Sequence, residues 1–72
     1  MDRLKLLRIS NCFTQSAIAE MLHVRQNTYS QYENGVREIP IDSLKALAVI
    51  YDTSIDYIVG LTDEESPYPR TQ

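Results

Sequence analysis

Hydrophobic residues recur at helical spacing in five short segments of the chain, at residues 2–10, 15–22, 25–34, 40–51 and 55–59. Four of the five segments are bounded on at least one side by residue types that begin or end helices. Thr14 and Ser54 can cap the helices that follow them, and Pro40 suits the start of a helix. Gly35 and Gly60 suit the position just after a last turn. The pattern therefore predicts an all-α fold, a five-helix bundle.

The second and third segments are joined by a very short connection. Only three residues, His23, Val24 and Arg25, separate the apolar end of one helix from the polar start of the next. So short a link makes the two helices cross at a steep angle. Residues 14–35 are therefore predicted to form a helix-turn-helix whose second helix can project from the body of the domain.

The second helix of this motif has two different faces. An inward stripe is predicted for Tyr29, Tyr32, Glu33 and Val36, which are spaced at i, i+3, i+4 and i+7. The other face, which we call the amide face, comprises Gln26, Asn27, Ser30, Gln31 and Asn34. An amide offers a donor and an acceptor together, the pair needed to bond adenine in the major groove.

The dimensions and charge of this helix also suit DNA. Ten helical residues are roughly 15 Å long, and the major groove of B-DNA is about 12 Å wide. The alternative is a solvated surface helix, but such faces are usually rich in Glu, Lys and Arg, whereas residues 26–31 carry no charge. The pattern therefore favours base readout.

Several motifs in order resemble one known family. They are RLKLLR, FTQ, the turn at His23 and Val24, YENG, IPIDSLKALA and SIDYIVGLTD, and they cover about residues 4–63. The chain resembles the helix-turn-helix regulators that include Cro and phage repressors, also called the xenobiotic response element family. The resemblance implies a lambda-repressor-like DNA-binding domain. It also implies a bacterial or phage-encoded transcriptional regulator, a repressor. A homodimer on an inverted-repeat operator is expected because three or four base contacts at about 1–3 kcal/mol each, with few phosphate contacts, select one site poorly from a genome.

The same resemblance assigns roles to particular residues. It implies base contacts by Gln26, Asn27 and Gln31, with Thr28 and Ser30 as further candidates. Gln15 is expected to bond a phosphate and to steady an amide of the recognition helix, and Asn34 to meet a phosphate. Arg8 is expected to pair with Glu33, which would explain an acid on the inward stripe; the alternative is a surface arginine.

Two arginines and a histidine are interpreted from their positions. Arg37, in the loop after the recognition helix, could meet the DNA backbone or simply be solvated. Arg25 stands where a capping residue is usual, and its charge is unfavourable at a helix N-terminus unless a phosphate is near; solvation is the alternative. His23 occupies a turn position that often holds glycine, so we expect a positive φ with some strain.

Composition limits the classes of function. The chain has 72 residues and a net charge of −3, which argues at first against a DNA partner. Residues 1–37, however, carry a net charge of +2 and residues 38–72 a net charge of −5. We therefore expect a DNA-binding domain at residues 1–61 that binds non-specific DNA weakly, followed by an acidic mobile tail at residues 62–72 that contains Pro67 and Pro69.

The remaining features indicate no catalysis. The single cysteine, Cys12, is a better loop-end filler than a nucleophile and suits a reducing cytoplasm. We find no metal-ligand spacing, phosphate loop or membrane-spanning run, so we predict no enzyme activity, no metal and no cofactor.

Binding to a partner other than DNA remains an alternative. An apolar patch at Tyr57, Ile58, Val59 and Leu61 could join two copies, or it could complete the core of one. With the acidic second half, this patch keeps open an alternative function, a protein-interaction module of antitoxin or adaptor type.

Overall fold

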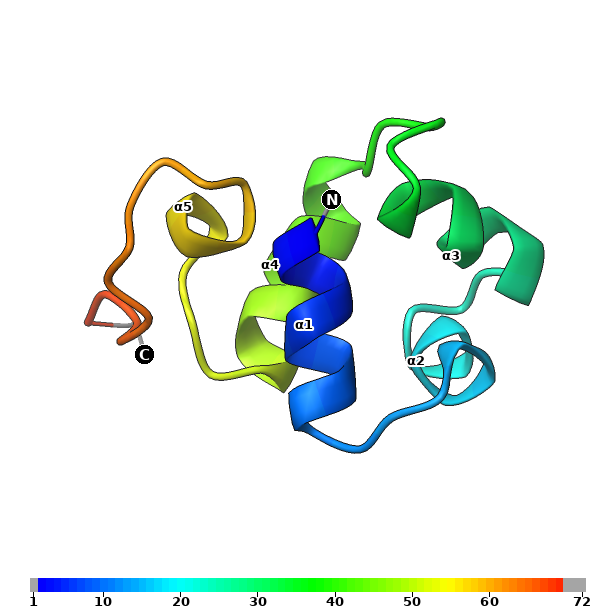
Figure 1. Cartoon of the computed structure of the whole chain (residues 1–72), viewed down its shortest axis with the longest axis horizontal. Helices are drawn as coiled ribbons and strands as arrows, with labels where there is room; N and C mark the ends of the chain where they lie inside the picture. Colours follow the sequence, from blue (N-terminus) through cyan, green and yellow to red (C-terminus); the bar gives the residue numbers. More distant parts are fainter. Residues whose placement is uncertain (1, 70–72) are drawn as a thin grey trace.

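The computed structural model describes residues 2–69, and these form five helices with no strand among them (Figure 1). The helices are α1 (Asp2–Ser10), α2 (Gln15–Met21), α3 (Gln26–Glu33), α4 (Ile41–Ile50) and α5 (Ile55–Ile58). The prediction of an all-α, five-helix fold is confirmed. Residues 70–72 of the expected tail lie outside the described part of the chain.

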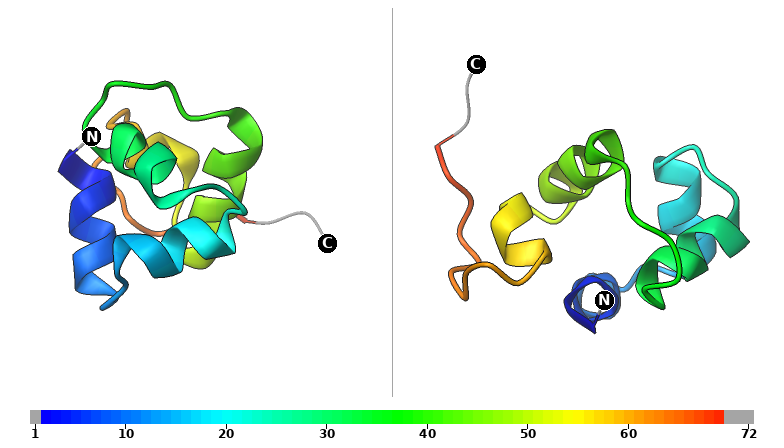
Figure 2. Two further views of the ribbon diagram at one scale, coloured as in Figure 1. Left: turned by 90° about the vertical axis from the view of Figure 1, so that its right-hand side faces the viewer. Right: turned by 90° about the horizontal axis from the view of Figure 1, so that it is seen from above.

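The core forms where α1 and α4 meet the other three helices. Figure 1 shows α1 in front of α4, with α2 and α3 on one side and α5 on the other, and Figure 2 shows the same arrangement from the side and from above. Each helix contributes side chains that are almost fully buried, including Leu4, Ile18, Tyr29, Leu47 and Ile58. Burial of these apolar surfaces is the main contribution to the stability of so small a domain.

The predicted caps and turns are present. The Thr14 hydroxyl accepts a hydrogen bond from the Ala17 amide, and the Ser54 hydroxyl accepts one from the Tyr57 amide, each at 3.0 Å. His23 has φ of 59° and Gly35 has φ of 73°, so both turns of the motif use the left-handed conformation. Cys12 and Asp52 also have positive φ, at 61° and 51°, which the sequence analysis did not foresee.

One residue of the predicted inward stripe is misplaced. Tyr29, Tyr32 and Glu33 are buried, but Val36 is 74% exposed. The i+7 spacing holds only while a helix continues, and α3 ends at Glu33. The positive φ of Gly35 then turns the chain, so that Val36 points away from the core.

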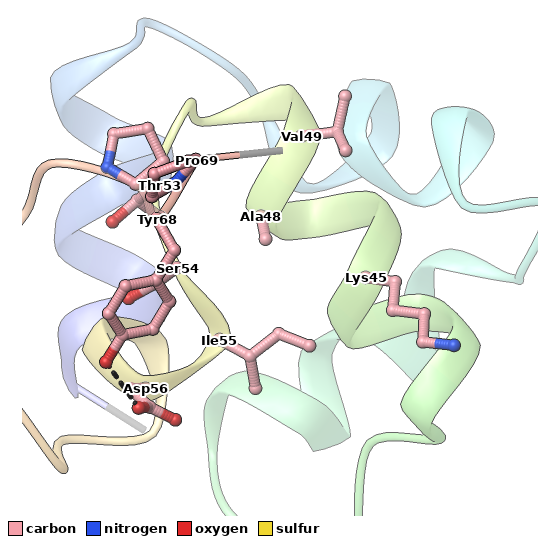
Figure 3. Close-up of a pocket in the computed structure, with 10 residues that line it drawn as sticks. Lys45, Ala48, Val49, Thr53, Ser54, Ile55, Asp56, Tyr68 and Pro69 are labelled. Carbon is pink, nitrogen blue, oxygen red and sulfur yellow. Dashed lines mark hydrogen bonds between the residues drawn. The ribbon is translucent and has the colours of Figure 1, made fainter. Parts of the chain in front are cut away.

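Residues 62–69 are in contact with the helices. The Thr53 hydroxyl donates to the Glu65 carbonyl at 2.6 Å. Figure 3 shows the hydrogen bond that the Tyr68 hydroxyl donates to Asp56 Oδ2, at 2.8 Å. Between this segment, α4 and α5 lies an open hollow of about 640 Å³. No residue of α3 lines it, so it is separate from the amide face. Mobility of the tail stays a prediction.

Arg3 joins the two ends of the domain. Its Nη1 donates to the carbonyls of Tyr57 and Thr62 at 2.8 Å each, and its Nη2 lies 3.2 Å from Asp63. The guanidinium carbon also lies 4.2 Å from the centroid of the Tyr57 ring. These contacts attach α1 to α5 and to the segment after it.

Candidate nucleic-acid interface

The amide face of α3 is directed outward by the burial of the opposite face. Tyr29 is fully buried and Tyr32 and Glu33 nearly so, which fixes the rotation of the helix about its axis. Gln26, Asn27 and Asn34 are consequently exposed. Three further polar residues of the helix are half-buried: Thr28, Ser30 and Gln31. In the left-hand view of Figure 2, α2 and α3 face the viewer, and α3 lies at the surface of the domain.

The connection between α2 and α3 places their ends close together. The Val24 amide donates to the Ala19 carbonyl at 3.0 Å, and the positive φ of His23 reverses the chain. Arg25 takes the N-cap position in an extended conformation, with φ of −73° and ψ of 153°, and its side chain makes no capping hydrogen bond. The first backbone amides of α3 therefore have no side-chain acceptor at their N-cap, beside an exposed cation.

The structure brings Arg8, Glu33 and Gln15 together beneath this surface. Arg8 Nε donates to Glu33 Oε2, and Arg8 Nη2 donates to Glu33 Oε1 at 3.3 Å. Arg8 Nη1 also donates to the Phe13 carbonyl at 3.0 Å. Gln15 Nε2 donates to Glu33 Oε1 at 3.2 Å. One carboxylate at the end of α3 is thus bonded by side chains of α1 and α2.

Charge is favoured in this cluster despite its burial. The side chains of Arg8 and Glu33 are only 12% and 3% exposed. Burial acts to raise the pKa of Glu33, but hydrogen bonding by Arg8, Tyr29 and Gln15 and the charge of Arg8 outweigh it and lower the pKa. The hydrogen bond to Glu33 raises the pKa of Arg8. The pair is therefore ionised at neutral pH.

Two tyrosines next to the pair are kept neutral. Burial raises the pKa of Tyr29 above its ordinary value, and the nearby carboxylate of Glu33 adds to that effect. Burial likewise raises the pKa of Tyr51, to about 12. Since both tyrosines are uncharged, Glu33 carries the negative charge of the cluster, and Arg8 and Gln15 both donate to it.

Gln15 differs in one respect from the role implied by the family resemblance. It was expected to steady an amide of the recognition helix, but its side-chain amide donates to the Glu33 carboxylate. An ionised acceptor forms a stronger hydrogen bond than a neutral amide does, which gives a physical reason for the preference. Gln15 is half-buried, so part of its side chain remains open to solvent.

The other two phosphate-contact candidates follow the recognition helix. Asn34 is the C-cap residue of α3, and its backbone amide donates to the carbonyl of Ser30. The Arg37 amide lies 3.4 Å from the Gln31 carbonyl, which holds the loop against the end of the helix. Both side chains are exposed.

The proposed contact patch between copies needs one correction. Ile58 is only 1% exposed and belongs to the core, because its side chain packs among the buried side chains of the other helices. Tyr57 is half-buried beneath Arg3. Val59 and Leu61 remain on the surface, where the two residues are 38% and 77% exposed. A patch for a partner is therefore smaller than the sequence suggested.

Other types of site receive no support from residues 2–69. No group of three or more His, Cys, Asp or Glu side chains there is arranged to hold a metal ion. Each helix in the same part of the chain is too short or too polar to cross a membrane. The arrangement of α2 and α3, with exposed amides on α3, defines a helix-turn-helix protein.

Comparison with known proteins agrees with this class. A family model described as helix-turn-helix matches residues 4–58. The chain belongs to the helix-turn-helix family, which confirms the resemblance to Cro and phage-repressor regulators. Because the family consists of regulators, the expectation that the chain is not an enzyme is also confirmed.

Three relatives from Bacillus subtilis (strain 168) are similar over nearly all of the chain. It is 40% identical to the uncharacterized HTH-type transcriptional regulator YobD, over 92% of this chain and 59% of YobD. It is 38% identical to the regulator ImmR, over 96% of this chain and 54% of ImmR. The regulator AnsR is 30% identical, over 97% of this chain and 60% of AnsR.

The chain thus spans 54–60% of the length of these curated relatives. No solved structure matches it.

Proposed function

We propose that this chain binds double-stranded DNA with sequence specificity through α3 and regulates transcription, as a repressor acting on an inverted-repeat operator. The observation that supports this most strongly is the exposed, uncharged amide face of a helix whose opposite face is buried. The family and the names of the three relatives support the same function. We place the protein in the cytoplasm of a bacterial cell, where it would meet DNA.

The proposed roles divide between bases and phosphates. Gln26 and Asn27, exposed at the start of α3, would bond base edges, and Gln31 would do so one turn further along. Thr28 and Ser30 are half-buried, and they are further candidates for contacts with bases. The phosphate contacts are assigned to residues around the two ends of the motif: Gln15, Arg25, Asn34 and Arg37.

Charge makes a dimer the favoured binding unit. Residues 1–37 carry a net charge of only +2, so few phosphates can be neutralised and base contacts must supply more of the affinity. Three or four base contacts at about 1–3 kcal/mol each select one site poorly from a genome. Two copies with recognition helices about 34 Å apart would read an inverted repeat. Tyr57, Val59 and Leu61 are the proposed contact between them.

A second candidate function is a protein-interaction module. The exposed side chains of Val59 and Leu61 favour it, and so does the net charge of −5 over residues 38–72. Selection of bound sequences from a random duplex library separates the two candidates. Enrichment of one inverted-repeat motif is expected for the DNA-binding function. Recovery of no motif, with only weak and salt-sensitive binding, would support the protein-interaction module instead.

A further inference from the structure

We propose that Arg8 and Glu33 are positioning residues for the DNA backbone, because they hold the side-chain amide of Gln15 in the orientation that offers an N–H group to a phosphate. The inference rests on the proposed function and goes beyond it by giving the buried ion pair a role in binding. Neither member of the pair would touch DNA, since their side chains are 12% and 3% exposed. They would act through Gln15 alone.

The side-chain amide of Gln15 faces Glu33 with its nitrogen. Its oxygen and nitrogen are similar in size, and an unrestrained glutamine can present either one. An ionised carboxylate accepts hydrogen bonds and donates none, so only the nitrogen can face Glu33. In the structure Gln15 Nε2 lies 3.2 Å from Glu33 Oε1. A flip of the amide would place two oxygens against each other, so Glu33 determines the orientation of Gln15.

Gln15 Nε2 keeps one N–H group that is not bonded to Glu33. The side-chain nitrogen of glutamine carries two hydrogens, and the bond to Glu33 uses one of them. Gln15 is half-buried at the first position of α2, and its bond to Glu33 places it beside the last residue of α3. The second N–H can therefore donate to a phosphate oxygen while the first stays bonded to the protein.

Arg8 holds the carboxylate of Glu33 in place. Arg8 donates to both of its carboxylate oxygens and also to the Phe13 carbonyl. The guanidinium is thus fixed at three acceptors, and the carboxylate plane is fixed by the guanidinium. The orientation of Gln15 thus depends on Glu33, and the orientation of Glu33 depends on Arg8. A glutamine held in this way has lost its rotamer freedom before DNA arrives.

The size of the effect follows from that lost freedom. Immobilising a side chain with several rotamers on binding lowers affinity by about 2- to 12-fold. Loss of the Glu33 acceptor should therefore weaken DNA binding by that factor for each copy bound. Because a phosphate carries no sequence information, the loss should be equal for the selected motif and for random duplex.

The test compares four proteins on the motif recovered by duplex selection and on a random duplex. They are the wild type, Gln15→Ala, the double variant Arg8→Met/Glu33→Leu, and the combination of all three substitutions. The double variant replaces a buried pair by apolar residues of similar volume, an exchange that folded domains tolerate. We expect it to lose about 2- to 12-fold in affinity when Gln15 is intact and nothing further when Gln15→Ala is already present.

Two outcomes of this experiment would overturn the inference. In the first, the double variant binds as tightly as the wild type. In the second, it loses the same factor with and without Gln15→Ala, so the pair acts on α3 as a whole. Either result leaves the proposed function intact if the wild type still selects a motif. If the wild type binds no duplex, the proposed function and the inference both fail.

A second measurement does not depend on the folding of the double variant. In the wild type, the side-chain amide resonances of Gln15 should move when Glu33 is protonated by acid or replaced in Glu33→Gln. Those of Gln26, which is exposed, serve as the matched control and should not move. If the Gln15 resonances match those of Gln26 and do not move on acidification or in Glu33→Gln, Glu33 does not hold the amide.

Discussion

Arg8 and Glu33 are bonded to each other through two nitrogen–oxygen pairs, although 25 residues separate them in the chain. This contact joins the first helix to the last residue of the recognition helix. With Gln15 bonded to the same carboxylate, three of the five helices meet at one buried anion. The cluster therefore attaches α1 and α2 to the end of α3, and the stability of the domain depends on it.

Removing one partner should destabilise the domain strongly. Glu33→Gln leaves the Arg8 charge largely buried without its counterion, so we expect a loss of about 3–5 kcal/mol in the free energy of unfolding. Urea denaturation at neutral pH measures this loss, with Glu20→Gln on exposed α2 surface as the control. Arg8→Met/Glu33→Leu should cost less than Glu33→Gln alone. Identical unfolding curves for Glu33→Gln and the wild type would show that the pair is energetically neutral.

Acidification should remove the same contribution. The pKa of Glu33 is lowered in the folded state, so its ionisation stabilises the fold above its unfolded pKa of about 4.3. That stabilisation is lost as the pH falls through the lower folded value. The free energy of unfolding should therefore decrease more steeply below about pH 4.3 in the wild type than in Glu33→Gln. Parallel pH profiles for the two proteins would contradict this assignment.

Arg3→Met should loosen the connection between the ends of the domain. The substitution removes hydrogen bonds to two carbonyls, a contact with the exposed Asp63, and the packing of the cation on Tyr57. We expect a loss of about 1.5–3 kcal/mol in the free energy of unfolding, because hydrogen bonds to charged groups contribute on that scale. Lys5→Met, also on α1 but exposed, is the control. Equal denaturation midpoints for the two variants would show that the Arg3 contacts are incidental.

Leu61→Glu should separate the two copies proposed to bind one operator. Leu61 is 77% exposed in a single copy, so a charge there is harmless to the monomer but costly in an apolar contact. Sedimentation on the selected duplex should give two copies for the wild type and one for Leu61→Glu. Leu6→Glu, at a residue 63% exposed on α1, should leave two copies. One wild-type copy per operator would defeat the dimer.

The sequence predicted the features of the fold that depend on local signals. Caps at Thr14 and Ser54, the turn at His23 and the end of α3 before Gly35 each follow from a few neighbouring residues. Burial was harder to predict at helix ends. Val36 continues the inward spacing in the sequence only, because the helix has already ended.

Apart from the Arg8–Glu33 pair, which the family resemblance implied, contacts between distant residues were not visible in the sequence. Ile58 was placed in a patch that could join two copies or complete the core, and the short α5 lies against the core and buries it. The contacts of Arg3 reach 54 to 60 residues along the chain, and no spacing pattern reports such a distance. The bond from Gln15 to Glu33 likewise depends on how α2 and α3 cross.

The base preferences of the wild type and of single alanine variants measure readout by the amide face most directly. Binding constants should be obtained for the selected motif and for each of its single-base changes. Gln26→Ala, Asn27→Ala and Gln31→Ala should each lose about 1–3 kcal/mol of discrimination at particular base pairs. Asn34→Ala and Arg37→Ala, which serve as controls, should weaken every duplex by the same factor. Equal losses on motif and random DNA for all five variants would contradict base readout by α3.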